Sequence, residues 1–175
     1  MSKKFIYIVL LIGIVFTLTG CEEKHIPNSL DVTKTKEVQL FQLKTTIPEE
    51  YIEMEKKSNF LGFQHEYKNR YYSDLTFQSD LIDEKELATA EDYLKYVLTE
   101  EIAQEYTVKE ETINEIAWTK ASYQTSNGKE EIFYNSDVYI ARHEGRFYAI
   151  IFGYNYKDNS YKKTIKQIIE NVEFK

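Results

Sequence analysis

The sequence predicts an α+β fold, with an antiparallel β-sheet of about five to six strands sandwiched between helices. Three observations predict it. The segment RFYAIIFGY is apolar on both of its alternating faces, which is typical of a strand buried on both sides. Two segments, residues 89–105 and the closing residues of the chain, have apolar side chains at helical spacing and can cover those faces. Asn-Gly and Glu-Gly pairs between β-forming runs indicate antiparallel hairpins.

The first half of the domain is expected to contain three strands and a helix. One strand is predicted in VQLFQLKTTIP, beginning at Val38 and stopping at Pro48. The segments LGFQHEY and YYSDLTFQ are predicted to form a hairpin around residues 68–70. In TAEDYLKYVLTEEIAQE, apolar residues recur at helical spacing, and Thr89 and Asp92 resemble a capping box at its start.

The second half is expected to be a three-stranded antiparallel meander followed by a helix. Two-residue turns are predicted at Asn127-Gly128 and Glu144-Gly145, because both pairs suit the positive φ angles of tight hairpins. The closing helix places one apolar stripe toward the core, made of Tyr161, Ile165, Ile168, Ile169 and Val172.

The N-terminal segment indicates export and attachment to a membrane. Lys3 and Lys4 precede about fourteen mostly apolar residues, fewer than the about 20 that a membrane-spanning helix needs. The run ends at LTGC, whose Cys21 is the only cysteine of the chain, and this stretch resembles the lipobox of bacterial lipoproteins. The resemblance implies cleavage after Gly20 and an acyl (palmitate-type) diacylglycerol anchor on Cys21. An uncleaved anchor, or a cleaved signal with an incidental cysteine, is the alternative.

These features divide the chain into a signal peptide (1–20), a lipidated cysteine with a flexible tether (21–37) and one globular domain (38–175). Without residues 1–20 the chain keeps 20 basic and 29 acidic residues, a net charge of −9. This acidic balance argues against nucleic acid as a partner. We therefore expect a protein held by lipid on the extracytoplasmic face of a bacterial cell membrane.

The order of predicted elements resembles that of PsbP and Mog1-like domains. The residues that carry this resemblance are the opening strand ending at Pro48, the helix at AEDYLKYVL after a hairpin, the meander with GRFYAIIF and the closing helix before NVEFK. The resemblance implies an α/β/α sandwich and an accessory or assembly role exercised by binding proteins. It implies no particular binding residue in this chain.

No motif of an enzyme, cofactor site or metal site is recognisable. The sequence has no G-x-S-x-G elbow and no phosphate-binding glycine loop, and Cys21 is assigned to lipid. His65 is expected to be a hydrogen-bonded core histidine, and His143 to face solvent beside a turn. Asp137 stands in an aromatic strand, where a buried carboxylate requires a partner such as Asn135 or a tyrosine hydroxyl. An exposed edge position is the other interpretation of Asp137.

The chain contains 15 tyrosines and 10 phenylalanines. Tyrosine is common both at the rim of aromatic cores and in binding surfaces. A partner surface, if present, is expected at Tyr71, Tyr72, Tyr154 and Tyr156. The main functional hypothesis is a non-catalytic, lipid-anchored binding protein for a protein or envelope component. The alternative is a small-ligand or metal receptor, or a hydrolase, with a pocket near Asp137 and His65.

Overall fold

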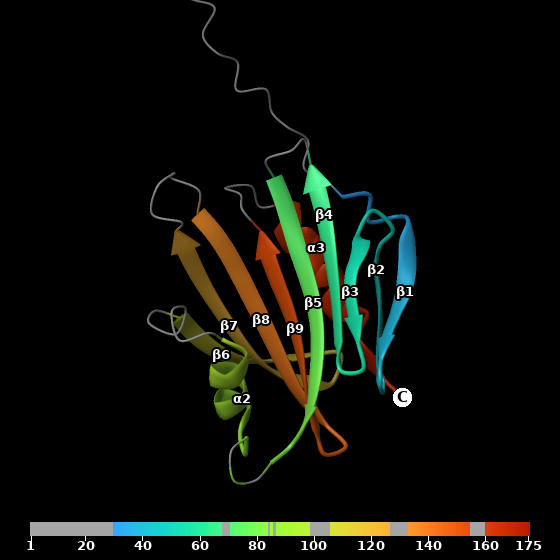
Figure 1. Cartoon of the computed structure of the whole chain (residues 1–175). Helices are drawn as coiled ribbons and strands as arrows, with labels where there is room; N and C mark the ends of the chain where they lie inside the picture. Colours follow the sequence, from blue (N-terminus) through green and yellow to red (C-terminus); the bar gives the residue numbers. More distant parts are fainter. Residues whose placement is uncertain are drawn as a thin grey trace, which may run out of the picture.

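The computed structural model describes residues 30–67, 71–83, 85, 87–98, 106–126, 133–154 and 160–175. These residues form two antiparallel sheets and two helices (Figure 1). In chain order the elements are β1 (Thr35–Leu40), β2 (Leu43–Pro48), β3 (Ile52–Lys57), β4 (Phe60–Tyr67), β5 (Tyr71–Leu81), α2 (Ala90–Val97), β6 (Tyr106–Ile113), β7 (Ile116–Ser126), β8 (Phe133–His143), β9 (Arg146–Tyr154), α3 (Ser160–Glu170) and β10 (Glu173–Phe174).

The prediction of one sheet with five to six strands was too simple. The larger sheet has seven strands in the order β3-β4-β5-β9-β8-β7-β6, and a second sheet has the order β1-β2-β10. The single strand predicted over Val38–Pro48 is a hairpin, because Phe41 adopts a φ of 52° and lets the chain reverse between β1 and β2. β3 and β6 lie at the two edges of the larger sheet and add strands that the sequence pattern did not predict.

The predicted turns have mixed outcomes. The turn at Glu144-Gly145 is confirmed, since both residues have positive φ and His143 pairs with Arg146. The two-residue turn at Asn127-Gly128 is wrong, because Ser126 pairs with Phe133 and six residues lie between these strands. β4 and β5 pair as predicted, from Tyr67 with Tyr71 onward, and residues 68–70 between them lie outside the described residues.

Both predicted helices are present, although α2 ends at Val97, before the predicted end at residue 105, and residues 99–105 lie outside the described residues. α2 begins at Thr89 with a capping box: Asp92 N donates to the Thr89 hydroxyl at 3.1 Å, and Thr89 N donates to the Asp92 carboxylate at 3.0 Å. Lys95 and Glu91 also form an i,i+4 ion pair, at 3.2 Å. In α3 the predicted stripe is buried, from Tyr161 to Ile169.

The larger sheet has an apolar core on each face, as the two-sided pattern of β9 predicted. The first core lies between the sheet and a layer made of β1, β2 and α3, whereas α2 lies on the opposite face, mainly over β7, β8 and β9 (Figure 1). The helix sandwich is thus present in part, because the small sheet shares the first face with α3. The first core includes Leu40, Leu43, Ile47, Phe63, Leu75, Phe77, Trp118, Tyr148, Ile150, Phe152, Ile165 and Ile169, and the second includes Tyr93, Leu94, Leu98, Ala121, Val138, Ile140, Phe147 and Ala149.

Packing begins earlier in the chain than the predicted boundary at Val38. Leu30 is 5% exposed and belongs to the first core. Gln167 of α3 also donates a hydrogen bond to the carbonyl oxygen of Val32, at 3.1 Å. The segment before β1 is therefore tied to the domain, which includes the described residues from Leu30 onward.

Candidate functional site

Asp137 lies in the interior of the larger sheet and has two polar partners on β7. Its residue exposure is 9%, and β8, which carries it, is flanked by β7 and β9. The Ser122 hydroxyl donates to Asp137 Oδ1 at 2.5 Å, and Lys120 Nζ lies 3.8 Å from Oδ2. The Lys120 ammonium also lies 4.7 Å from the centre of the Tyr139 ring. We call Lys120, Ser122, Asp137 and Tyr139 the Asp137 cluster.

Strand register brings this cluster together. Ser122 is directly opposite Asp137, and Lys120 is directly opposite Tyr139. Because side chains alternate between the faces of a strand, all four point to the face of the first core. The prediction of an exposed edge position for Asp137 was therefore wrong. The burial interpretation holds, but the partners are Ser122 and Lys120 rather than Asn135 or a tyrosine hydroxyl.

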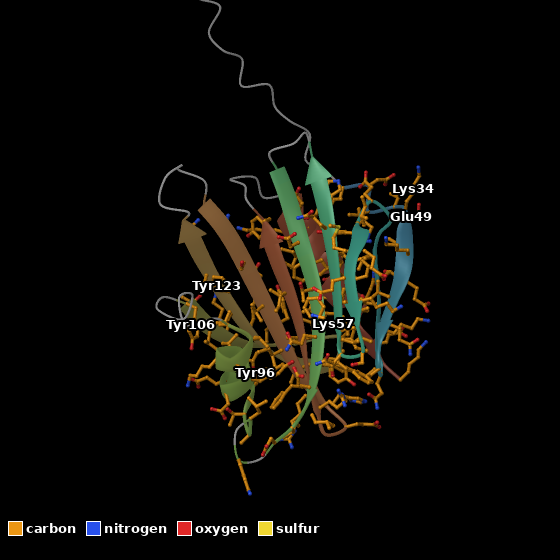
Figure 2. The ribbon with its side chains drawn as sticks, viewed as in Figure 1. Lys34, Glu49, Lys57, Tyr96, Tyr106 and Tyr123 are labelled. Carbon is orange, nitrogen blue, oxygen red and sulfur yellow. The ribbon has the colours of Figure 1, made fainter. Side chains whose placement is uncertain are left out.

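A cavity of about 520 Å³ opens beside the cluster. Its volume is within the range of about 300 to 1,000 Å³ that small-molecule sites occupy, but it is shallow and open to solvent. Burial, together with the charge of Asp137, raises the pKa of Tyr154 to about 12, so its hydroxyl stays protonated at neutral pH. Figure 2 shows two tyrosines of the rim on neighbouring strands, Tyr106 and Tyr123. The lining is Tyr106, Thr107, Ser122, Tyr123, Gln124, Asn135, Ser136, Asp137 and Tyr154.

His65 does not join this site. The cross-strand row that contains it continues through Ser73 and Tyr154 to Asn135, so three strand spacings of about 4.8 Å separate His65 from β8. Its ring packs edge-on against Tyr51, with 6.1 Å between ring centres. The expectation of a hydrogen-bonded histidine was wrong for Nδ1, which is buried and has no hydrogen-bond partner among the described residues. His65 does not line the cavity beside Asp137.

The environment of His65 predicts a pH dependence of stability. Burial lowers its pKa below the usual 6.5, against a smaller opposing effect of Glu50. Because its pKa is lower in the folded state, His65 binds a proton more readily in the unfolded chain. The contribution of neutral His65 to the stability of the fold is therefore present above about pH 6.5 and is lost as the pH falls through the folded-state pKa. We expect the melting temperature of the full chain to drop between about pH 7 and pH 5. In His65→Phe this drop should shrink.

The measurement is a series of thermal melts followed by circular dichroism. His143→Gln is the matched control, because His143 is a second half-buried histidine at a different end of the sheet. The control should retain the drop seen in the wild type. Equal drops in wild type and His65→Phe would show that His65 does not couple folding to protons.

The structure places the side chain of one of the four residues of the predicted tyrosine surface, Tyr154. Tyr154 is only 7% exposed and stacks on Tyr161 in the first core, with 5.8 Å between ring centres. Tyr71 and Tyr72 begin β5, but their side chains are outside the described part of the structure. Tyr156 and the predicted lipidation site Cys21 also lie outside the described residues. Tyr154 therefore acts as a core residue at the rim of the Asp137 cavity.

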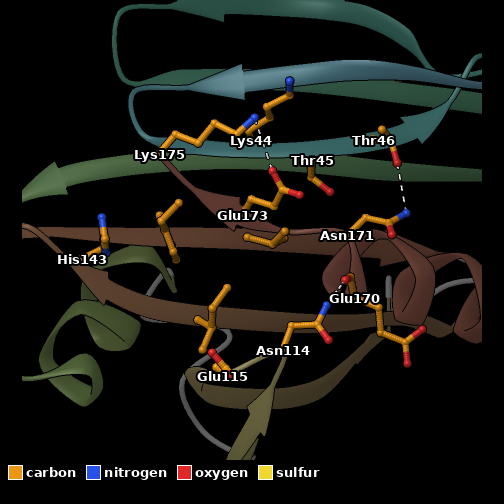
Figure 3. Close-up of a pocket in the computed structure, with 13 residues that line it drawn as sticks. Lys44, Thr45, Thr46, Asn114, Glu115, His143, Glu170, Asn171, Glu173 and Lys175 are labelled. Atoms are coloured by element: carbon orange, nitrogen blue, oxygen red, sulfur yellow. Dashed lines mark hydrogen bonds and ion pairs between the residues drawn. The ribbon is translucent and has the colours of Figure 1, made fainter.

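A larger open cleft, of about 1070 Å³, lies where α3 ends (Figure 3). We call it the C-terminal cleft. β2 forms one wall and the β6–β7 turn the other, while His143 and the last residues of the chain lie between them. The His143 ring stacks on Phe174 at 4.4 Å, so His143 is half-buried rather than facing solvent as expected. The lining is Lys44, Thr45, Thr46, Asn114, Glu115, Ile116, His143, Glu170, Asn171, Val172, Glu173, Phe174 and Lys175.

Many polar groups of the C-terminal cleft hold the closing segment of the chain in place. Asn171 Nδ2 donates to the Thr46 hydroxyl at 3.1 Å, and the Thr45 hydroxyl donates to the carbonyl oxygen of Ile168 at 2.8 Å. Asn114 donates to the carbonyl oxygen of Glu170. Both threonine hydroxyls thus take part in hydrogen bonds that fix the closing segment, so the cleft offers hydrogen-bonding groups and a defined shape. The sequence carried no signal for this cleft, since its parts come from distant segments.

The described part of the chain contains no group of three or more histidine, cysteine, aspartate or glutamate side chains placed to hold a metal ion. None of its helices has the length and apolar character needed to span a bilayer.

Comparison with known proteins shows the fold. No protein-family model and no curated protein matches the chain. A crystal structure from Bacteroides thetaiotaomicron aligns with a TM-score of 0.56 at 12% identity, over 81% of this chain and 48% of that protein. The Ran-binding protein Mog1p of Saccharomyces cerevisiae aligns with a TM-score of 0.54 at 12% identity, over 81% of this chain and 95% of Mog1p.

A Pseudomonas aeruginosa protein of unknown function gives a TM-score of 0.48 at 12% identity, over 78% of this chain and 94% of that protein. The chain spans about half the length of the Bacteroides protein. At 12% identity, the likenesses to the Bacteroides protein and to Mog1p show the fold alone. The described domain has a Mog1-like fold.

Proposed function

We propose that this protein is a lipid-anchored lipoprotein on the extracytoplasmic face of a bacterial cell membrane, where it binds a protein or an envelope component without catalysing a reaction. The anchoring part of the proposal rests on the sequence. LTGC follows a basic start and a short apolar run, and a double acyl chain on Cys21 supplies about 0.8 kcal/mol of membrane affinity for each buried CH₂ group. The acidic domain adds no polybasic attraction to lipid headgroups.

The binding part rests on one observation, the filled interior. Small-molecule and catalytic sites are usually concave and enclose their ligand. Here the space between the layers is occupied by large side chains, including Trp118, Tyr148 and Phe77, each of which is 0% exposed. Both cavities described above are open hollows at the surface, which suit the contours of a larger partner. Mog1p, a Ran-binding protein of the same fold, is a fold-level precedent for a protein partner.

The second candidate is a receptor for a small polar ligand. The burial of Asp137 and the cavity of about 520 Å³ beside it favour this candidate. His65 no longer supports it, because three strand spacings separate it from β8. Thermal melts of the full chain with calcium, zinc, manganese or magnesium test the metal version, since saturation at 100 times the dissociation constant adds about 2.7 kcal/mol. A large shift that Asp137→Asn removes would replace the first candidate by the second.

The direct test is site-specific photocrosslinking in membranes of the producing cells. A photoreactive amino acid replaces Tyr72 of the predicted tyrosine surface or Glu115 at the rim of the C-terminal cleft. The control position is Lys162, which is exposed on α3. We expect a discrete crosslinked product from Tyr72 or Glu115 but none from Lys162. Equal labelling at all three positions, or none, in membranes that contain normal amounts of the protein would contradict the proposal.

A further inference from the structure

β3 is an edge strand whose surface is open along its whole length. It pairs with β4 on one side, and among the described residues it has no strand on the other. All six of its residues are exposed. Ile52 and Met54 are 65% and 64% exposed, more than most large apolar side chains of the described chain. A strand of this kind presents unpaired backbone N–H and C=O groups that another strand can complete.

The charges of β3 are ordered along the strand. Its sequence, IEMEKK, places the acids Glu53 and Glu55 in the first part and the bases Lys56 and Lys57 at the end. Lysines and a bulge commonly protect an edge from pairing with other chains, and β3 has both, with its bulge between Glu53 and Glu55. A segregated arrangement of signs has a further property, because an antiparallel copy of the same strand meets it with opposite charge.

From this pattern we propose that β3 pairs antiparallel with β3 of a second copy of this chain, about a two-fold axis between Met54 and Glu55. In that register Glu53 lies opposite Lys56 of the other copy, and the symmetry makes this pair twice. Ile52 lies opposite Lys57, whose methylene stem covers it. A shift of one residue in either direction places a glutamate opposite a glutamate. Like charges directly opposite are destabilising, so the charges disfavour both neighbouring registers.

The direction in which the side chains of β3 point also supports this register. Glu53 and Lys56 pair with Phe63 and Leu61 of β4, which both point to the first core, so Glu53 and Lys56 share that face. Ile52 and Lys57 pair with Gln64 and Phe60 and share the other face. The opposed residues of the two copies therefore lie on the same side of the joint sheet. A six-residue strand buries less area than the about 800 Å² per partner of a standard interface, so the dimer is expected to be weak and dependent on concentration.

β6, the opposite edge of the sheet, is the competing surface. It is also largely exposed, with Val108 at 43%. Its charged residues Lys109, Glu110 and Glu111 carry a net negative charge, whereas those of β3 sum to zero. The Glu110 carboxylate already accepts a hydrogen bond from Thr119, at 2.8 Å. These features favour β3, and Lys109→Glu provides a matched charge reversal on the competing edge.

The test is sedimentation equilibrium of the full chain in density-matched detergent micelles, over protein concentrations up to about 1 mM. We expect a reversible monomer–dimer equilibrium in the wild type. Glu53→Lys and Lys56→Glu should each weaken it about tenfold, because each creates two like-charge pairs. The double variant Glu53→Lys/Lys56→Glu restores opposite charges and should recover the wild-type dimer. Lys109→Glu should leave it unchanged.

Each other outcome overturns the proposal. A wild-type chain that stays monomeric over this range has no pairing edge. Association that only Lys109→Glu weakens assigns the interface to β6. Association that none of the charge variants alters arises elsewhere, for instance from the apolar N-terminal segment. If both single variants lose the dimer and the double variant does not recover it, the charges are needed for dimerisation but do not pair with each other across the axis.

Discussion

Replacing Trp118 with alanine should lower the free energy of unfolding by about 3 to 5 kcal/mol, the range for deleting a large buried aromatic side chain. Trp118 is 0% exposed on β7 and belongs to the first core. Its ring meets the Tyr139 ring edge-on at 6.1 Å between ring centres, and alanine removes that contact and leaves a large cavity. Chemical denaturation of wild type and variant, compared by their midpoints and slopes, gives the difference.

Trp118→Phe is the matched control for this prediction. The indole Nε1 is buried without a hydrogen-bond partner among the described residues. Phenylalanine therefore removes a donor that gains nothing in the folded state and keeps most of the aromatic volume. The loss in Trp118→Phe should be clearly smaller than in Trp118→Ala. If both variants lose similar amounts of unfolding free energy, the indole N–H has a hydrogen-bond partner after all. A negligible loss of unfolding free energy in Trp118→Ala would contradict the packing of the first core.

Replacing Lys120 with methionine should destabilise the domain by about 1 to 3 kcal/mol, although methionine keeps most of the apolar stem. Lys120 supplies a cation 3.8 Å from the buried carboxylate of Asp137. The Lys120 and Asp137 side chains are 24% and 13% exposed, so water screens the pair in part and the loss stays below that of a fully buried pair. Asp137→Asn should change stability by less than about 1 kcal/mol, since an amide oxygen still accepts from Ser122.

Lys109→Met is the control, because Lys109 is exposed on β6 and lies directly opposite Lys120. Removing it relieves a like-charge pair and should not destabilise the domain. The same denaturation curves serve for all three variants. Equal losses in Lys120→Met and Lys109→Met would show that a general change in surface charge, rather than the contact with Asp137, sets the effect.

The parts of the fold with strong periodic patterns could be predicted from the sequence. α2 and α3 have apolar stripes at helical spacing, and β9 is apolar on both faces because it lies between two cores. The edge strand β3 has no such pattern, since all six of its residues are exposed. β10 is two residues long and exists through its pairing with β2, so only tertiary structure defines it.

The candidate site could be predicted only in part, and the reason is strand register. A two-residue turn at Asn127-Gly128 pairs Ser126 with Lys129 and places Asp137 opposite Trp118. The structure pairs Ser126 with Phe133, which shifts the register by four residues and places Asp137 opposite Ser122. The shift is even, so the face of the strand was predictable while the partner was not. The C-terminal cleft joins segments from β2, the β6–β7 turn and the end of α3, which no local pattern relates.

The most direct measurement of the proposed anchoring is the mass of the N-terminal peptide of the protein extracted from the membranes of the producing cells. The lipid-anchor account predicts a mature chain that begins at Cys21, with a diacylglycerol-modified sulfur, and predicts that this species disappears in Cys21→Ala. A chain that retains residues 1–20, begins at another residue or carries an unmodified Cys21 would contradict it.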